Sequence, residues 1–156
     1  MNTLLRKFWL SLAPAFAVGL LISAGCSTMA AGTDEGIKVK LTGDQEVPPV
    51  KTAASGGGTI VISADKSVSG SITTSGIEGT VAHIHDSVPG QTMCGAKNGP
   101  VITPLTKGPD NSWSVPAGAK LNDAQYASYK AGNLYVNVHS AANRGGEICT
   151  RLTPVK

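Results

Sequence analysis

The sequence predicts an all-β domain with one short helix, and three observations support this fold class. Short runs rich in Val and Ile alternate apolar and polar residues with a period of two, which is typical of strands buried on one face. The 156 residues include 19 glycines and 9 prolines, and only 15% are charged, which indicates many turns. One stretch alone carries the signature of a helix start.

Before the helix, each expected strand is bounded by turn-forming residues. The prolines of Val47-Pro48-Pro49-Val50 forbid regular ladder pairing in that stretch. Pro100 and Pro104, at the two ends of another expected strand, favour an edge position for it. The expected strands span residues 37–41, 58–63, 68–74, 80–86, 100–105 and 113–115.

The helix is expected at residues 123–131. Asn122 can accept a hydrogen bond from the first turn, and Gln125, three residues later, completes a capping box. Lys130 suits the negative C-terminal end of the helix dipole, and Gly132 is typical of a helix stop.

After the helix, residues 134–140 and 146–152 are expected to form a hairpin, whose register follows from matching the two apolar faces. That register places Leu134, Val136 and Val138 opposite Leu152, Thr150 and Ile148. On the other face it places Tyr135, Asn137 and His139 opposite Arg151, Cys149 and Glu147.

Residues 1–25 have the three-part form of a signal peptide. Arg6 and Lys7 give a positive start, an apolar run follows over residues 8–22, and small residues end the segment. The apolar run is shorter than the roughly 20 residues that a transmembrane helix needs. We therefore expect an exported protein, with residues 26–36 as a tether and one domain over residues 37–156.

The end of this segment, residues 21–26, is similar to a bacterial lipobox, in which the cysteine, here Cys26, becomes lipidated. Ser23 departs from the usual leucine, and cleavage after Ala30 is the alternative. We expect a periplasmic or outer-membrane-anchored lipoprotein in the first case and a secreted protein in the second. Membrane contact would come only through a lipid on Cys26.

The chain has three cysteines, an odd number. Whether Cys26 carries lipid or is removed with the signal, Cys94 and Cys149 remain as a pair in an oxidising compartment. Both routes therefore predict a Cys94–Cys149 disulfide bond.

The charge of the chain is nearly balanced. Arg6 and Lys7 belong to the signal, which leaves 11 of the 13 basic residues against 10 acidic residues in the rest of the chain. No basic run and no interleaving of aromatic and basic residues occurs, and we therefore expect no nucleic-acid partner.

The three histidines of the chain lie on comparable faces of two expected strands. His83 and His85 are two residues apart and project from one face, and His139 lies on the polar row of the hairpin. If these strands are neighbours, the three imidazoles can bind one metal ion, and the affinity order favours copper over zinc. The alternative is three independent surface histidines.

Further residues are candidates around this site. Met93 is a candidate soft ligand and Asp86 a candidate hard ligand. In the expected register Glu147 lies opposite His139 and could accept its second ring N–H, and Asn137 is a weaker second-shell neighbour.

Several stretches together resemble the CHRD domain family, which is named for chordin and is common in exported microbial proteins. They occur in the order and spacing of the family over residues 37–152. The chain departs from the family pattern at Cys149-Thr150 and in the loop at residues 91–94, and both departures fit an added disulfide. The stretches that carry the resemblance are residues 41–50 (LTGDQEVPPV), 82–85 (AHIH), 121–125 (LNDAQ), 131–140 (AGNLYVNVHS) and 145–148 (GGEI).

The resemblance implies a Greek-key β-sandwich and little about function. The His-x-His strand is also similar to the copper-ligand strand of copper/zinc superoxide dismutase, but three histidines are too few for both metal sites of that enzyme. Two functions stay open: a metal-binding envelope module, with copper favoured, and a metal-free protein-binding or structural module of the envelope. No nucleophile–base arrangement or phosphate loop occurs, and we expect no enzymatic activity.

Overall fold

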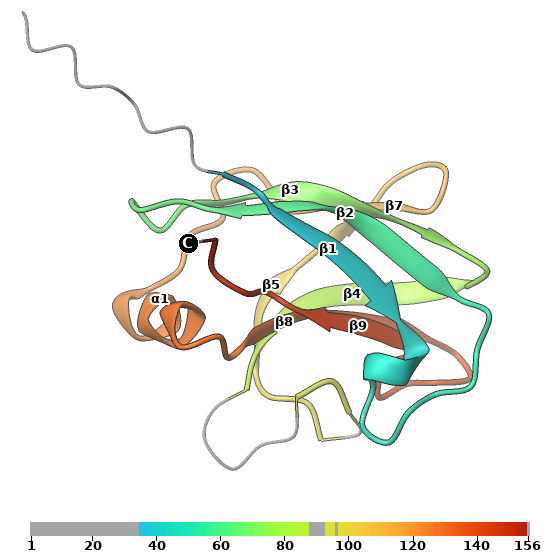
Figure 1. The fold of residues 1–156 in the computed structure, drawn as a ribbon. Helices are drawn as coiled ribbons and strands as arrows, with labels where there is room; N and C mark the ends of the chain where they lie inside the picture. The colour runs from blue at the N-terminus through green and yellow to red at the C-terminus, as the bar shows by residue number, and fades with distance from the viewer. Residues whose placement is uncertain (1–34, 88–92, 96, 156) are drawn as a thin grey trace, which may run out of the picture. The chain divides into compact units, whose positions relative to one another are not determined.

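The computed structural model of the chain describes residues 35–87, 93–95 and 97–155 (Figure 1). The predicted signal peptide, Cys26 and most of the predicted tether lie outside the described residues. The described strands and helix are β1 (Ile37–Thr42), β2 (Ser55–Ile62), β3 (Val68–Ser75), β4 (Gly79–Asp86), β5 (Val101–Pro104), β6 (Thr106–Lys107), β7 (Ser112–Ser114), α1 (Asp123–Lys130), β8 (Leu134–Ser140) and β9 (Ile148–Arg151).

The strands form one antiparallel sheet in the order β5-β4-β8-β9-β1-β2-β3-β7-β6. Figure 1 shows this sheet folded into two layers, with β1, β2 and β3 in one and β4, β8 and β9 in the other. The layers join where Thr42 of β1 pairs with Cys149 of β9. The two end strands of the order, β5 and β6, are separated only by Leu105, so that the sheet nearly closes on itself. The predicted all-β class with one short helix is confirmed.

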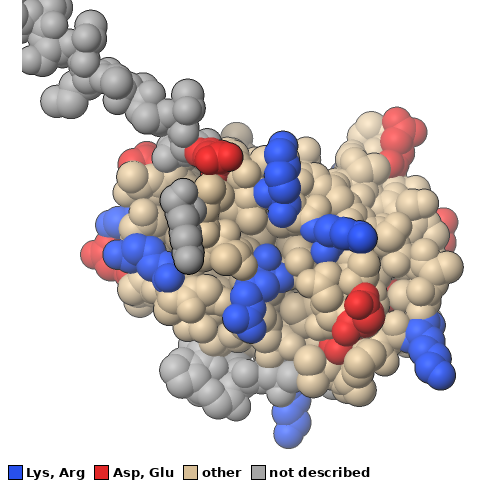
Figure 2. Space-filling view, viewed as in Figure 1, with Lys and Arg blue, Asp and Glu red and all other residues tan. Residues whose placement is uncertain are grey.

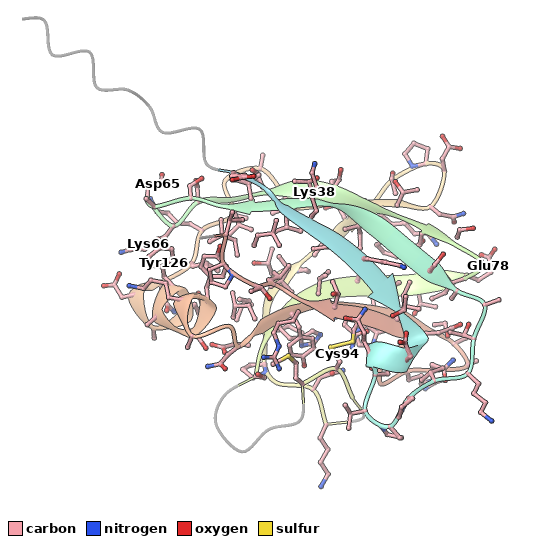
Figure 3. All side chains as sticks on the ribbon, viewed as in Figure 1. Lys38, Asp65, Lys66, Glu78, Cys94 and Tyr126 are labelled. Carbon is pink, nitrogen blue, oxygen red and sulfur yellow. A yellow bond between two sulfur atoms is a disulfide. The ribbon has the colours of Figure 1, made fainter. Side chains whose placement is uncertain are left out.

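The main core lies between the two layers, where side chains from both meet (Figure 3). Leu41 and Ile60 from one layer and Ile84 and Val136 from the other are fully buried. Burying one such side chain contributes roughly 1.5–3 kcal/mol. The alternation seen in the sequence therefore selects the face of each strand that packs inward.

The opposite face of β8 differs from the prediction, because it is also buried. Tyr135 and Asn137 are fully covered, although their row was expected to be a polar outer face. A second small cluster of Cys94, Tyr135 and Cys149, with Met93 packed against it, lies over this face. The segment that follows β4 thus covers a surface that strand periodicity alone leaves open.

Helix α1 begins and ends close to the predicted residues. The side chain of Asn122 accepts the N–H of Gln125 at 2.8 Å, and the side chain of Gln125 accepts the N–H of Asn122 at 2.9 Å, which completes the capping box. Gly132 follows with φ of 76°, a left-handed conformation that favours glycine at a helix end.

The predicted hairpin register is confirmed. Val136 pairs with Thr150, Val138 with Ile148, and Asn137 with Cys149. Strand β9 begins only at Ile148, however, so that Glu147 precedes the strand. The alternation of side chains along β9 therefore does not extend to Glu147.

Strand β2 begins at Ser55, earlier than the predicted start at residue 58. The three glycines at residues 56–58 resemble a loop in sequence, but they belong to the ladder with β1 and β3. A Cβ on Gly58 would lie 2.1 Å from the carbonyl oxygen of Ser71 on β3. Close approach of two backbones, and not a turn, therefore requires glycine at this position.

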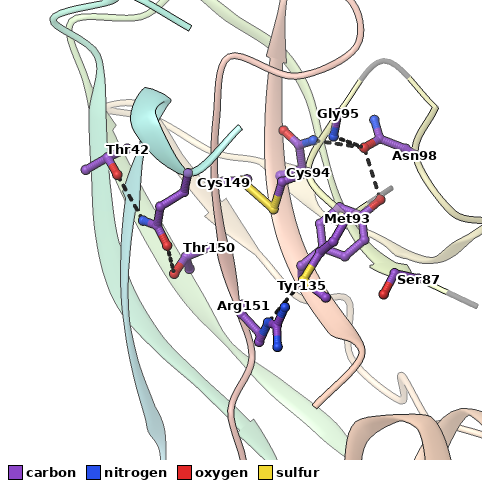
Figure 4. The surroundings of a disulfide bond; sticks show 12 residues. Thr42, Ser87, Met93, Cys94, Gly95, Asn98, Tyr135, Cys149, Thr150 and Arg151 are labelled. Atoms are coloured by element: carbon purple, nitrogen blue, oxygen red, sulfur yellow. Dashed lines mark hydrogen bonds between the residues drawn. A yellow bond between two sulfur atoms is a disulfide. The ribbon is translucent and has the colours of Figure 1, made fainter. Parts of the chain in front are cut away.

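The predicted disulfide between Cys94 and Cys149 is present, with Cα atoms 5.9 Å apart (Figure 4). It ties the segment after β4 to β9. A hydrogen bond also holds the segment around Cys94 in place: the N–H of Val47 donates to the carbonyl oxygen of Cys94 at 2.5 Å.

Basic and acidic side chains are interspersed over the face drawn in Figure 2. This agrees with the near balance of charge in the sequence. In the described part of the chain, no helix is long and apolar enough to span a bilayer.

Candidate metal centre

The three histidines come together because β4 and β8 are hydrogen-bonded neighbours. His83 pairs with Asn137 and His85 with Tyr135 across this ladder, and His139 follows two residues after Asn137. One ligand nitrogen from each ring can be chosen so that all three lie within 4.8 Å of one another. The adjacency that the sequence could only assume is therefore present.

The cluster is not a set of solvated surface histidines. The exposed fraction of His85 is 3% and that of His139 is 6%, whereas His83 is half-buried. His85 stacks on Tyr135, with ring centroids 5.1 Å apart and an angle of 12° between the ring planes. The rings of His85 and His139 are thus buried, and that of His83 is partly exposed.

Two backbone carbonyl groups orient the buried rings. Nδ1 of His85 lies 2.8 Å from the carbonyl oxygen of Gly99, and Nδ1 of His139 lies 2.9 Å from that of Arg144. A carbonyl oxygen only accepts, so we assign the ring hydrogen of both histidines to Nδ1. In the neutral rings Nε2 then carries the lone pair that a metal ion requires.

The ring of His83 contacts that of His139. Its Nδ1 lies 3.3 Å from Nε2 of His139. Since Nε2 of His139 carries a lone pair, Nδ1 of His83 must donate this hydrogen bond. A metal ion that uses both nitrogens would replace the shared hydrogen, and the hydrogen of His83 would move to its Nε2.

The rings are held in the neutral form that binds metal. Burial lowers the pKa of His83, His85 and His139, because the charged imidazolium loses its hydration. For His85 the pKa falls to about 4, where burial outweighs the opposing effect of the Gly99 carbonyl group. At neutral pH no proton therefore has to leave His85 before a metal ion can bind.

The predicted role of Glu147 as the partner of His139 is wrong. Its carboxylate accepts hydrogen bonds from Oγ1 of Thr52 at 2.7 Å and Oγ of Ser140 at 2.5 Å. Because Glu147 precedes β9 and follows Gly146 with φ of 134°, strand alternation does not set its direction. The ring N–H of His139 is instead held by the Arg144 carbonyl group.

Asn137 lies next to the cluster and is fully buried, but it makes no hydrogen bond to a histidine among the described residues. Its amide nitrogen lies 3.4 Å from both Oδ1 of Asn98 and the carbonyl oxygen of Gly145. Asn137 therefore lies opposite His83 in the β4–β8 ladder, without the predicted role of supporting a ring by a hydrogen bond.

The two additional candidate ligands are engaged elsewhere. Asp86 accepts a hydrogen bond from Oγ of Ser128 on α1 at 2.5 Å. The sulfur of Met93 accepts a hydrogen bond from Nε of Arg151 at 3.2 Å, beside the disulfide (Figure 4). Among the described residues, the cluster consists of the three histidines.

Sequence reasoning missed the groups that support the rings. The hydroxyl group of Tyr135 accepts a hydrogen bond from the N–H of Gly99 at 3.0 Å and donates one to Oδ1 of Asn98 at 3.0 Å. These two bonds position the carbonyl group of Gly99, which contacts Nδ1 of His85. The carbonyl groups of Gly99 and Arg144 are backbone atoms, and no residue type identifies them in a sequence. Of the supporting groups, only the side chain of Tyr135 could have been predicted from the sequence, because Tyr135 lies in the same strand row as His139.

A hollow of about 330 Å³ opens beside His139. It lies over the adjoining ends of β4 and β8 and the turn that follows β8. Its lining residues are Thr80, Val81, His139, Ser140, Ala141 and Arg144. Of the three histidines, only His139 lines this hollow.

Comparison with known families assigns the chain to a family. The CHRD domain profile matches residues 37–152, which is most of the chain and includes all of the described strands. The chain therefore belongs to the CHRD domain family. Searches of curated proteins and of solved structures each found no match.

Proposed function

We propose that this protein is an exported envelope protein whose CHRD domain binds one divalent transition-metal ion, with copper favoured over zinc. The ligands would be Nε2 of His85, Nε2 of His139 and Nδ1 of His83. The signal-like residues 1–25 support export, and the lipobox-like end of that segment supports an anchor on Cys26. The proposal assigns binding, rather than catalysis, to the site.

The observation that carries the proposal is Nε2 of His85, which is buried and has no hydrogen-bond partner among the described residues. Leaving such an atom unsatisfied costs roughly 1–3 kcal/mol. One ring nitrogen from each of the three histidines lies within 4.8 Å of the others. A metal ion between the three nitrogens would satisfy Nε2 of His85, and three neutral imidazoles suit Cu(II) best in the affinity order of divalent metals.

The test is calorimetric titration of the purified protein with Cu(II) and Zn(II). The wild type should bind one copper ion. His85→Ala and His139→Ala should each weaken copper binding by more than about 100-fold, because changes outside the ligand set alone typically cost 10- to 100-fold. Circular dichroism of each variant confirms that the sheet is intact.

Asp86→Asn and Met93→Leu serve as matched controls, because both side chains have partners away from the rings. Each should change copper affinity by less than about threefold, a shift below 1 kcal/mol. Copper binding that survives His139→Ala unchanged would contradict the three-histidine site. A wild type that binds no metal would support the alternative, a metal-free binding or structural module.

The proposed export is tested by the mass of the mature protein. Lipidation predicts loss of residues 1–25 and an added diacylglyceryl group on Cys26. Cleavage after Ala30 predicts a shorter chain without lipid, and Cys26→Ser should then leave the product unchanged. A mature protein that keeps Met1 would contradict export by this route.

A further inference from the structure

The two carbonyl groups that hold the buried histidine rings belong to connecting segments rather than to strands. Gly99 lies between β4 and β5, and Arg144 lies in the turn between β8 and β9. Neither residue takes part in the strand pairing. The hydrogen bonds to Nδ1 of His85 and to Nδ1 of His139 are therefore only as well aligned as these two segments are.

The side chain of Asn98 joins the two segments. Its Nδ2 donates to the carbonyl oxygen of Gly145 at 2.5 Å. Asn98 directly precedes Gly99 in the chain, and Gly145 directly follows Arg144. One side chain therefore bridges the immediate neighbours of both carbonyl groups that orient the rings.

The hydrogen-bond partners of Asn98 allow its amide only one orientation (Figure 4). Oδ1 accepts the N–H of Gly95 at 3.0 Å and the hydroxyl group of Tyr135 at 3.0 Å. A backbone N–H only donates and a carbonyl oxygen only accepts, so exchanging Oδ1 and Nδ2 would break the bonds to Gly95 and Gly145. The Tyr135 oxygen in turn accepts the N–H of Gly99. The network is thus continuous from Gly145 to the peptide of Gly99.

We propose that Asn98 is a positioning residue of the metal site proposed above, and that it fixes the ring hydrogens of both His85 and His139 on Nδ1. Its side chain makes no hydrogen bond to a histidine among the described residues and acts through the two carbonyl groups. Both Nε2 atoms are then presented by one network before a metal ion arrives. Ordering the ligands in advance strengthens binding, because less conformational freedom is lost on binding.

The first measurement needs no metal ion. The nitrogen-15 NMR shifts of a histidine ring distinguish a protonated nitrogen from one that carries a lone pair. In the wild type at neutral pH, His85 and His139 should each show a protonated Nδ1. Asn98→Ala should give a mixture of the two neutral tautomers at both rings. Two rings that keep a protonated Nδ1 in Asn98→Ala would overturn the positioning role.

Asn98→Asp separates the two halves of the network. An aspartate keeps an acceptor for Gly95 and Tyr135, but it has no N–H for the carbonyl oxygen of Gly145. The fixed tautomer should therefore be lost at His139 and kept at His85. A structural loss without a positioning role would affect the two rings alike, and that result would contradict the proposed network.

Asn122→Ala is the matched control, because it removes the asparagine that caps α1 and leaves both connecting segments intact. It should destabilise the protein without changing either tautomer or the affinity for copper. Circular dichroism of every variant checks that the sheet is formed.

Calorimetric titration with Cu(II) is the second measurement. Asn98→Ala should weaken copper binding about 10- to 100-fold, the range for groups that orient metal ligands. Mixed tautomers with unchanged copper affinity would overturn the role of Asn98 in metal binding. A wild type that binds no copper would overturn the metal site, and the tautomers of the metal-free variants would still decide whether Asn98 orients the rings.

Discussion

Replacing Cys94 and Cys149 together by alanine should lower the free energy of unfolding by about 4 kcal/mol. The two residues are 55 positions apart, and the chain-entropy model gives this value for a closed loop of that length. Urea unfolding with linear extrapolation measures the difference. Reduction of the wild type with a thiol should produce the same loss, which separates the bond itself from the removed sulfur atoms.

The double variant should also weaken copper binding. The disulfide anchors the segment that carries Asn98 and Gly99, and the carbonyl group of Gly99 orients His85. Releasing this segment loosens the hydrogen bond between Nδ1 of His85 and the Gly99 carbonyl group, at an expected cost of about 10-fold in affinity. A double variant as stable as the wild type would contradict the first expectation, and unchanged copper affinity would contradict the second.

Glu46→Gln should remove a pH dependence of stability worth about 3 kcal/mol. Burial raises the pKa of the Glu46 carboxyl group from 4.5 to about 7, because the charged form loses its hydration and Oε1 has no hydrogen-bond partner among the described residues. Below pH 4.5 the group is protonated in both states, and the stabilisation from holding the proton is complete. As the pH rises toward 7, the unfolded chain loses its proton first, and the free energy of unfolding falls.

Chemical unfolding at several values between pH 4 and pH 8 measures this effect. The wild type should lose stability relative to Glu46→Gln across that interval and run parallel to it above about pH 7, where the folded group also ionises. Glu78→Gln is the matched control, because Glu78 is exposed. Curves for the wild type and Glu46→Gln that stay parallel from pH 4 to pH 8 would contradict the raised pKa.

The elements that could be predicted from the sequence are those that local patterns define. Apolar alternation determined the β8–β9 register, and the Asn122–Gln125 pair determined the start of α1. Cysteine counting predicted the disulfide without knowledge of the fold. The histidine cluster needed one further fact, the pairing of β4 with β8, which periodicity does not contain.

The predictions that the structure contradicts depended on features that local sequence patterns do not contain. The row of Tyr135, Asn137 and His139 is buried because a segment without periodicity folds over it. Glu147 turns away because β9 begins at Ile148, two residues later than expected, so that strand alternation does not set the direction of its side chain. The carbonyl groups that orient His85 and His139 are backbone atoms, and a sequence cannot distinguish them from any others.

The joining of β5 to β6 through Leu105 bears on how the protein behaves at high concentration. One extended segment pairs with β4 along its first half and with β7 along its second. The two margins of the sheet are therefore occupied by a single continuous stretch of chain, and Pro100 and Pro104 flank its first half. Unpaired margins are where sheets add strands from other molecules and begin to form fibrils, and prolines there suppress such growth. The described domain should thereby resist self-association through its own backbone at high concentration.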